Sequence, residues 1–178
     1  SDEQKCLIAH QLAVGALRYF LLKFARTTVI VFDFKEALSF EGETGCFCQY
    51  SAVRANSIFR KLEENGDSLE QFQKMAADPT VSFDIFDAES ANEIWSLVVL
   101  ASRLSDTARQ ASEQNEPAIL AKYTFNLAKA FNLFYHHHKI IVEEDAVKRS
   151  FLVVVADMAR RSLTAALATM GIQVPEKM

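Results

Sequence analysis

Apolar residues recur every three or four positions over most of this chain, the spacing that places side chains on one face of an α-helix. The pattern predicts five long helices, over residues 3–26, 47–65, 87–115, 116–138 and 143–170. The connection at 67–82 is predicted to contain one more helical turn, and the β-branched run at 27–32 predicts a short extended element at most. We therefore expect an all-α helical bundle, preceded by a short junction segment made of a helix and a loop.

Composition narrows the class of protein. The 178 residues, half of them hydrophobic, can bury a core, and five glycines with three prolines are too few for the turns of a β-sandwich or barrel. The net charge of −4 argues against binding nucleic acid by bulk electrostatics, so any RNA contact must use local patches. Three cysteines give no disulfide framework, and the apolar start lacks a cleavage site. We expect a cytoplasmic monomer without DNA or membrane partners.

The amino-acid sequence contains no recognisable motif for catalysis or metal binding. His136, His137 and His138 are consecutive, and neighbouring helical residues point about 100° apart, so they cannot converge on one ion. We interpret them as a solvated helix end and expect no metal site. Cys46 and Cys48 are expected to be small buried residues rather than a redox or zinc site, because neither a second pair nor a histidine at a suitable spacing accompanies them in sequence.

Two glycines three residues apart, Gly42 and Gly45, mark the segment before the second helix. Such a pair predicts either a positive φ or the close approach of another chain segment, because glycine has no Cβ. Farther on, residues 131–135 bring three aromatic rings together. Phe131 and Phe134 are expected to fill the core, whereas Tyr135 adjoins the helix end, where an exposed ring could stack on an unpaired base.

Three stretches of the chain resemble arginyl-tRNA synthetases. Residues 38–45, Leu-Ser-Phe-Glu-Gly-x-Thr-Gly, with Gln49 and Tyr50 after them, resemble the junction between the catalytic half and the anticodon-binding domain. Residues 128–135, Ala-x-x-Phe-Asn-x-Phe-Tyr, and the final Gly-Ile-x-x-Pro-Glu-x-Met resemble the two anticodon-contacting segments of that domain. The resemblance runs from about Val14 to Met178. Cys46, Phe47 and Phe34 depart from the Pro, Tyr and Trp usual in that family.

The resemblance implies two regions and a set of site residues. Residues 1–46 would be the C-terminal edge of the catalytic half, and 47–178 a DALR-type anticodon-binding bundle. The implied anticodon contacts are Tyr135, Met178, Phe134 and Asn132. Candidates for contact with the tRNA backbone are Arg54, Arg60, Arg103, Arg109, Lys148, Arg149, Arg160 and Arg161. The junction loop is defined by Gly42, Thr44, Gly45, Gln49 and Tyr50.

The implied function is recognition of the arginine tRNA through its anticodon arm, as part of an ATP-dependent arginine–tRNA ligase. The His-Ile-Gly-His and Lys-Met-Ser-Lys signatures of class I synthetases do not occur in the sequence, so we expect no catalytic residues here and no activity of the chain alone. ATP and Mg²⁺ are implied only for the complete enzyme. The expected partners are the arginine tRNA and the catalytic half, which the apolar first helix would contact. Two alternatives remain: a non-catalytic protein-interaction module derived from a synthetase, or one piece of a split synthetase.

Overall fold

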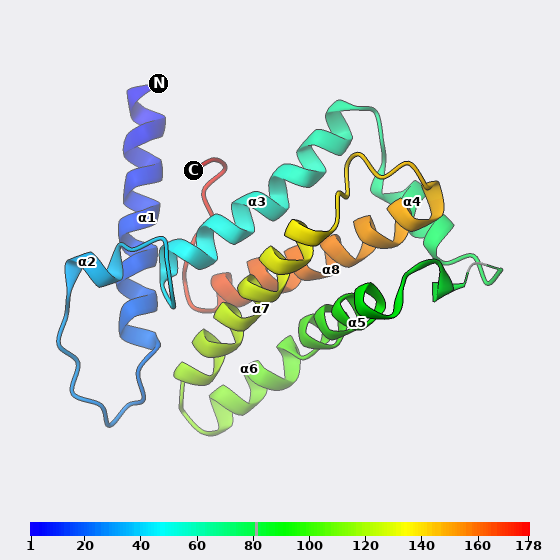
Figure 1. The fold of residues 1–178 in the computed structure, drawn as a ribbon. Coiled ribbons are helices and arrows are strands. Elements are labelled where there is room, and N and C mark those ends of the chain that lie inside the picture. The colour runs from blue at the N-terminus through cyan, green and yellow to red at the C-terminus, as the bar shows by residue number, and fades with distance from the viewer. Residues whose placement is uncertain (81) are drawn as a thin grey trace.

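The computed structural model describes residues 1–80 and 82–178, and every regular element in those ranges is a helix (Figure 1). This confirms the all-α prediction. In chain order the elements are α1 (Asp2–Leu22), α2 (Phe34–Ala37), α3 (Gly45–Glu64), α4 (Leu69–Ala76), the 3₁₀ turn η1 (Phe83–Ile85), α5 (Ala88–Ser102), α6 (Leu104–Glu113), α7 (Ala118–His137) and α8 (Ala146–Thr169).

The predicted helix at 87–115 is two helices, α5 and α6, separated at Arg103. Neither glycine nor proline stands at this break. Instead, the Ala101 carbonyl accepts hydrogen bonds from the side chains of Tyr123 (3.3 Å) and Ser162 (2.9 Å), which belong to α7 and α8. The last carbonyls of a helix lack intrahelical donors, and these two bonds satisfy one of them, so tertiary contacts stabilise a helix end where the sequence predicts continuity.

Smaller differences affect the first helix and the connections. Helix α1 ends at Leu22, four residues before the predicted end, and residues 27–32 form no regular element. The predicted single turn near Phe72 is the eight-residue helix α4, because Ser68 and Gln71 form a reciprocal capping box at its start.

Helix α8 lies at the centre of the bundle and contacts α3, α4, α5 and α7. Its buried face, which includes Leu152, Leu163 and Leu167, meets Ile58 of α3 and Leu127 of α7 in one continuous hydrophobic core. The core fixes the relative positions of α3, α7 and the C-terminal tail, residues 171–178, that follows α8. These three segments form the site described below.

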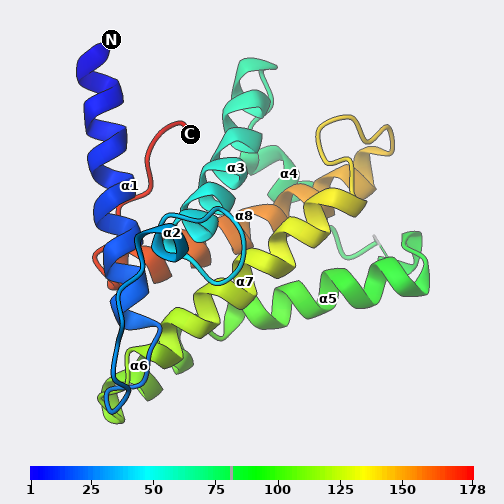
Figure 2. The same ribbon diagram turned by 60° about the vertical axis from the view of Figure 1, so that its left-hand side comes forward.

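Helix α1 stands beside the bundle, and its N-terminal part extends away from it in both views (Figures 1 and 2). Only Gly15, Ala16, Tyr19 and Phe20 of this helix are buried. Among the described residues, α1 is the one helix whose length and apolar composition would allow it to cross a membrane. Helices that pack in soluble proteins satisfy the same two criteria, so the absence of a membrane partner stays a prediction.

Candidate nucleic-acid interface

A cleft of about 390 Å³ lies between α3, the end of α7 and the C-terminal tail. The lining side chains of α3 are three or four residues apart, so they lie on one face of the helix and all face the cleft. Tyr135 of α7 faces them, and the last two residues of the chain close the cleft. Its complete lining consists of Tyr50, Val53, Arg54, Ser57, Arg60, Tyr135, Lys177 and Met178.

Arg54 lies between two tyrosine rings of this cleft. Its guanidinium carbon is 5.0 Å from the centroid of the Tyr50 ring and 5.6 Å from that of Tyr135, within the range of cation–π attraction. The same guanidinium donates to Asn132 Oδ1 at 3.1 Å and to Tyr50 Oη at 3.3 Å. Tyr135 is half-buried, because its ring stacks on that of Phe131 with centroids 6.2 Å apart. The aromatic surface of the cleft is therefore held in place before any ligand arrives.

Arg60 and Met178 form the other side of the cleft. Arg60 Nη1 donates to the backbone carbonyl of Glu176 at 3.1 Å, which ties the tail to α3. The Met178 side chain remains 38% exposed, so its thioether is available at the mouth. Neither Arg54 nor Arg60 forms an ion pair with a carboxylate of the described chain. Both guanidinium charges are free to meet an anionic ligand.

The other predicted basic residues do not join the cleft. Arg103 lines a separate groove of about 690 Å³ at the opposite end of α7, together with Lys23 and Lys122. The remaining five each contact a carboxylate of the protein. These pairs are Arg109 with Asp106 (3.0 Å), Lys148 with Glu143 (3.5 Å), Arg149 with Asp67 (2.6 Å), Arg160 with Asp157 (2.6 Å) and Arg161 with Asp157 (3.0 Å).

Two of the predicted anticodon contacts have other roles in this structure. Phe134 has no exposed surface and belongs to the hydrophobic core, as its spacing in the sequence predicted, so its ring is not presented to the cleft as the family resemblance had implied. Asn132 is partly buried: it accepts from Arg54 and donates to Ser51 Oγ at 2.7 Å. It holds Arg54 in place rather than presenting its own amide to the cleft.

Three cleft residues were not among the predicted site residues. Val53 and Ser57 lie on α3 beside Arg54, and Lys177 precedes Met178. The helical spacing of positions 50, 54 and 57 could have indicated Ser57 once Tyr50 and Arg54 were assigned to one face. Lys177 could have been inferred from its neighbour, whereas Val53 could not be told from a core residue.

The junction loop uses its two glycines in different ways. Gly42 has a φ of +77°, so a side chain there would be strained although nothing surrounds it. A Cβ added to Gly45 would lie 2.6 Å from the backbone oxygen of Gly15 and 2.9 Å from Tyr19 Cβ. Both predicted uses of glycine, a positive φ and a close approach, are confirmed. The close approach brings α1 directly against the start of α3.

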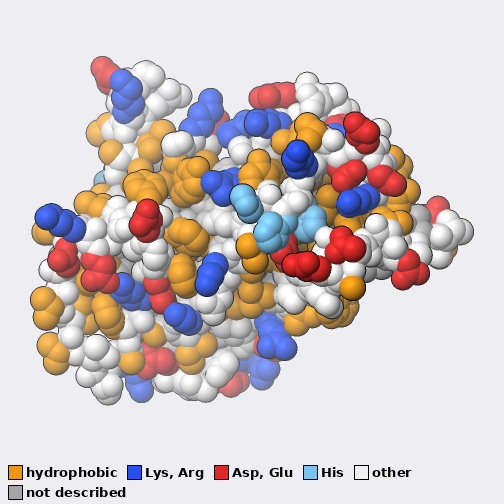
Figure 3. Space-filling view, viewed as in Figure 1, with side chains coloured by type: hydrophobic (Ala, Val, Ile, Leu, Met, Phe, Trp, Pro, Cys, Tyr) orange, Lys and Arg blue, Asp and Glu red, His pale blue; other side chains and the backbone are white. Residues whose placement is uncertain are grey.

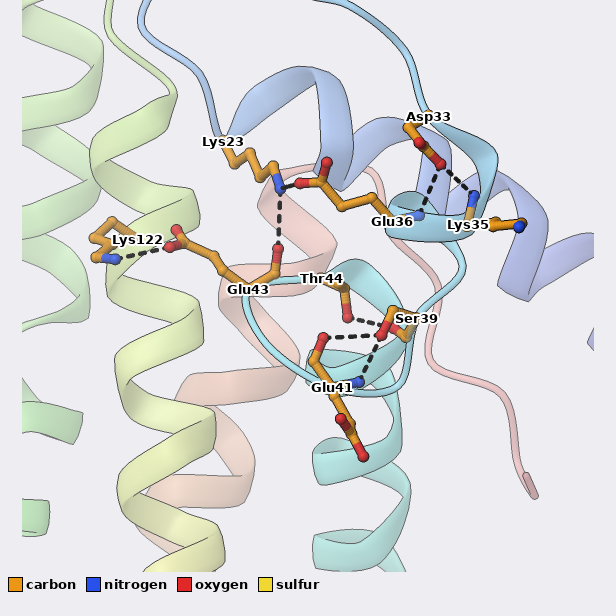
Figure 4. Close-up of polar contacts among 9 residues, drawn as sticks. All are labelled: Lys23, Asp33, Lys35, Glu36, Ser39, Glu41, Glu43, Thr44 and Lys122. Carbon is orange, nitrogen blue, oxygen red and sulfur yellow. Dashed lines mark hydrogen bonds and ion pairs between the residues drawn. The ribbon is translucent and has the colours of Figure 1, made fainter.

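Polar contacts attach the junction loop to α1 and α7 (Figure 4). Thr44 caps α3: its Oγ1 accepts from Phe47 N at 3.2 Å and donates to the Ser39 carbonyl at 2.6 Å. Glu43 Oε2 pairs with Lys122 Nζ of α7 at 2.7 Å, and Nζ of Lys23, the residue that follows α1, contacts the Glu43 carbonyl at 3.4 Å. Thr44 and Gly45 are therefore structural residues of the junction.

The histidine triplet is not simply a solvated helix end. Figure 3 shows histidine side chains beside acidic ones where α7 ends. His137 Nδ1 lies 2.6 Å from Glu93 Oε2, and His138 is buried with its Nε2 3.4 Å from Glu93 Oε1. Burial lowers the pKa of His138, against the opposing effect of Glu93. Within the described residues, no group of three histidine, cysteine or acidic side chains is arranged to hold a metal ion.

Cys46 and Cys48 are buried on α3, as expected for small core residues. Burial raises the pKa of both thiols, so the reactive thiolate is disfavoured.

Sequence comparison identifies the class of this helical bundle. Residues 48–178 match the DALR anticodon binding domain, and the chain belongs to that family. It is the form of the domain found in arginyl-tRNA synthetases. The chain is 36% identical over 177 residues to an arginine–tRNA ligase of Clostridium perfringens, covering 99% of this chain and 29% of that protein. It is also 36% identical over 180 residues to the ligase of Pyrococcus furiosus, covering 27% of that protein.

Solved structures give the same fold. The arginyl-tRNA synthetase of Thermus thermophilus superposes with a TM-score of 0.76 at 25% identity, over 96% of this chain and 27% of that one. The enzyme of Plasmodium falciparum superposes with a TM-score of 0.72 at 23% identity, over 97% of this chain and 28% of that one. The chain thus spans between a quarter and a third of the length of these relatives.

Proposed function

We propose that this chain recognises the arginine tRNA by its anticodon arm, with an anticodon base enclosed between Tyr135 and Met178. The observation that carries the proposal is the convergence of these two residues, 43 positions apart in sequence, on one cleft that also contains Arg54 and Arg60. Family membership supports the same ligand class.

The charge of the cleft suits an anionic strand with exposed bases. Its lining includes the cationic side chains of Arg54, Arg60 and Lys177 and no acidic side chain, although the whole chain carries a net charge of −4. Single-stranded RNA is commonly bound by basic side chains that meet the backbone and aromatic rings that stack on bases. The cleft offers both kinds of side chain.

The second proposed partner is the catalytic half of an arginine–tRNA ligase. Large apolar side chains are exposed on α1 and on the segment before α3, and several are more than half exposed. Exposed large apolar side chains in this number are typical of a region that another domain covers. These side chains include Leu7, Leu17, Leu21, Val29, Val31, Phe34, Leu38 and Phe40.

In this proposal, ATP and Mg²⁺ act in the complete cytoplasmic enzyme, and this chain supplies only recognition. The chain alone should therefore catalyse no arginine-dependent pyrophosphate exchange. An exchange rate above background that survives repurification would contradict the proposal that this chain supplies recognition without catalysis.

The experiment for the cleft is a Tyr135→Ala substitution, assayed by binding to an arginine tRNA transcript at fixed salt. Loss of one base–aromatic stack is worth about 1 to 3 kcal/mol, so affinity should fall by roughly ten- to a hundredfold. Trp95→Ala is the matched control, because Trp95 is 63% exposed on α5 and lies outside the cleft. Equal losses in both variants, or no loss in Tyr135→Ala, would contradict the proposed site.

A further inference from the structure

Gln49 joins three separate segments of the molecule through one buried amide. Its side chain is completely buried at the start of α3. Nε2 donates to the backbone carbonyl of Gln11 in α1 at 3.1 Å and to that of Gln173 in the C-terminal tail at 2.8 Å. Both amide protons are thus used. Because both partners are acceptors, the nitrogen must point toward them.

The surrounding chain makes room for this amide. A Cβ on Gly15 of α1 would lie 2.5 Å from Gln49 Nε2, so only glycine at that position lets the side chain pass. Gln49 Oε1 is buried without a hydrogen-bond partner in the described residues, which costs free energy. The two bonds of its nitrogen to backbone carbonyls of different segments mean that this side chain joins those segments as well as filling the core.

The tail depends on side-chain contacts of this kind for its position. Between Gln173 and Met178, no backbone–backbone hydrogen bond attaches the described tail. Instead, the Arg18 guanidinium of α1 donates to the Gly171 carbonyl, and Gln11 Nε2 donates to Gln173 Oε1 at 3.2 Å. In both ribbon views the tail runs between α1 and α3 (Figures 1 and 2). The path of the tail is therefore set by α1 and α3 together.

We propose that Gln49 is a positioning residue that fixes the C-terminal tail so that Met178 faces Tyr135, and that it couples the position of α1 to the shape of the cleft. The RNA-binding consequence rests on the proposed function, whereas the positioning of Met178 can be measured without RNA. Displacing α1 would move the Gln11 carbonyl, release the amide and loosen the tail five residues before Met178.

The first test follows the four methionine methyl groups by ¹³C-methyl NMR. In Gln49→Leu, the Met178 methyl signal should move toward the position of an unstructured methionine, because Met178 leaves the cleft that it lines together with Tyr50 and Tyr135. The signals of Met75 on α4 and Met158 within α8, which both lie outside the C-terminal tail, should keep the dispersion of the folded bundle. Gln73→Leu, an exposed glutamine of α4, is the control. An unmoved Met178 signal in folded Gln49→Leu would overturn the proposal.

A milder variant covers the case in which Gln49→Leu does not fold. Gln11→Ala removes only the exposed side-chain bond to Gln173, and leaves the buried amide in place. It should shift the Met178 signal in the same direction by a smaller amount. If it leaves that signal at its wild-type position and Gln49→Leu is unfolded, Gln49 is a folding residue and the proposal fails.

The second test separates positioning from general stability by a double-mutant cycle on tRNA affinity. Gln49→Leu should weaken binding about as much as Met178→Ala, and should add little in the Met178→Ala background. If the two substitutions together reduce the binding free energy by the sum of their separate effects, Gln49 acts independently of Met178 and the proposal is contradicted. If Met178→Ala binds tRNA normally while the methyl signal still moves in Gln49→Leu, the positioning holds and the base contact assigned to Met178 is wrong.

Discussion

Two sets of arginines in this molecule differ in what surrounds the guanidinium. Arg54 and Arg60 of α3 contact tyrosine rings, an amide oxygen and a backbone carbonyl. Arg149, Arg160 and Arg161 of α8 contact carboxylates at 2.6 to 3.0 Å. The first set keeps its positive charge for a ligand, whereas the second has it neutralised by the fold. A basic residue is therefore a good candidate for RNA contact only when its charge is not neutralised by a carboxylate of the protein itself.

The carboxylates explain this difference physically. Asp157 is 1% exposed, accepts hydrogen bonds from Arg160 and forms an ion pair with Arg161, so withdrawing either guanidinium toward RNA would leave a buried charge less well paired. Breaking a buried pair usually costs more than a surface contact returns. We expect the two sets to respond in opposite ways to substitution: the cleft set through affinity, and the paired set through stability.

The largest expected effect is on affinity. Replacing Arg54 and Arg60 together by glutamine should weaken tRNA binding at least about tenfold, since each charge-assisted contact to RNA is worth roughly 1.5 to 3 kcal/mol. The measurement is titration with an arginine tRNA transcript at constant ionic strength.

The matched variant replaces Arg109 and Arg161 by glutamine. Both of these side chains are exposed and paired with carboxylates, so the double change removes the same charge without touching the cleft. Its affinity should stay near that of the parent. Equal losses in the two doubles would mean that net charge, rather than the cleft, controls binding.

The next effect is on stability. Arg149→Gln should lower the free energy of unfolding by about 1 to 2 kcal/mol, because it removes a charge-assisted bond and a cation–π contact. Arg149 bonds Asp67 at 2.6 Å and lies 5.3 Å from the Phe72 ring, joining α8 to α4. Urea unfolding of the variant beside Arg54→Gln provides the comparison. A stability loss confined to Arg54→Gln would reverse the assignment of the two sets.

A smaller effect is expected in the salt dependence of binding. Each phosphate neutralised on a single strand contributes about 0.7 to the slope of log K against log salt. Arg54→Gln should therefore reduce the magnitude of that slope by up to about 0.7, the value of one phosphate contact, while Arg161→Gln should leave it unchanged. Parallel slopes for both variants and the parent would show that Arg54 makes no phosphate contact, and would leave it the role of supporting the tyrosines.

The smallest effect concerns His138, another side chain whose charge the fold controls. Burial lowers the pKa of His138 in the folded state, so the unfolded chain takes up this proton first as pH falls. Its contribution should destabilise the fold below the ordinary histidine pKa of about 6.5 and should have no effect above it. His138→Asn should lose less stability than the parent between pH 7.5 and 5.5 in thermal unfolding. An identical loss in both proteins would assign that pH dependence to other groups.

The sequence predicted the long helices well because their apolar spacing is regular, and it failed where tertiary bonds override local pattern, as at Arg103. It also assigned Tyr135 and Met178 to one candidate site, because the motifs around them are long and specific, and both residues line the cleft. It could not separate Arg54 from Arg149, since their decisive partners, Asn132 and Asp67, lie 78 and 82 positions away. The sequence indicated Gln49 only as part of a motif. Its two acceptors are backbone carbonyls, which every residue has, so the amino-acid sequence does not reveal them.

The central claim is that the cleft reads the anticodon, and it is tested most directly by changing protein and RNA together. Parent and Tyr135→Ala proteins are each titrated with an arginine tRNA transcript and with one altered only in its three anticodon bases. The account predicts that the parent prefers the arginine anticodon and that Tyr135→Ala binds the two transcripts with nearly equal affinity. A preference of unchanged size in Tyr135→Ala would contradict the account, because the anticodon would then be read elsewhere.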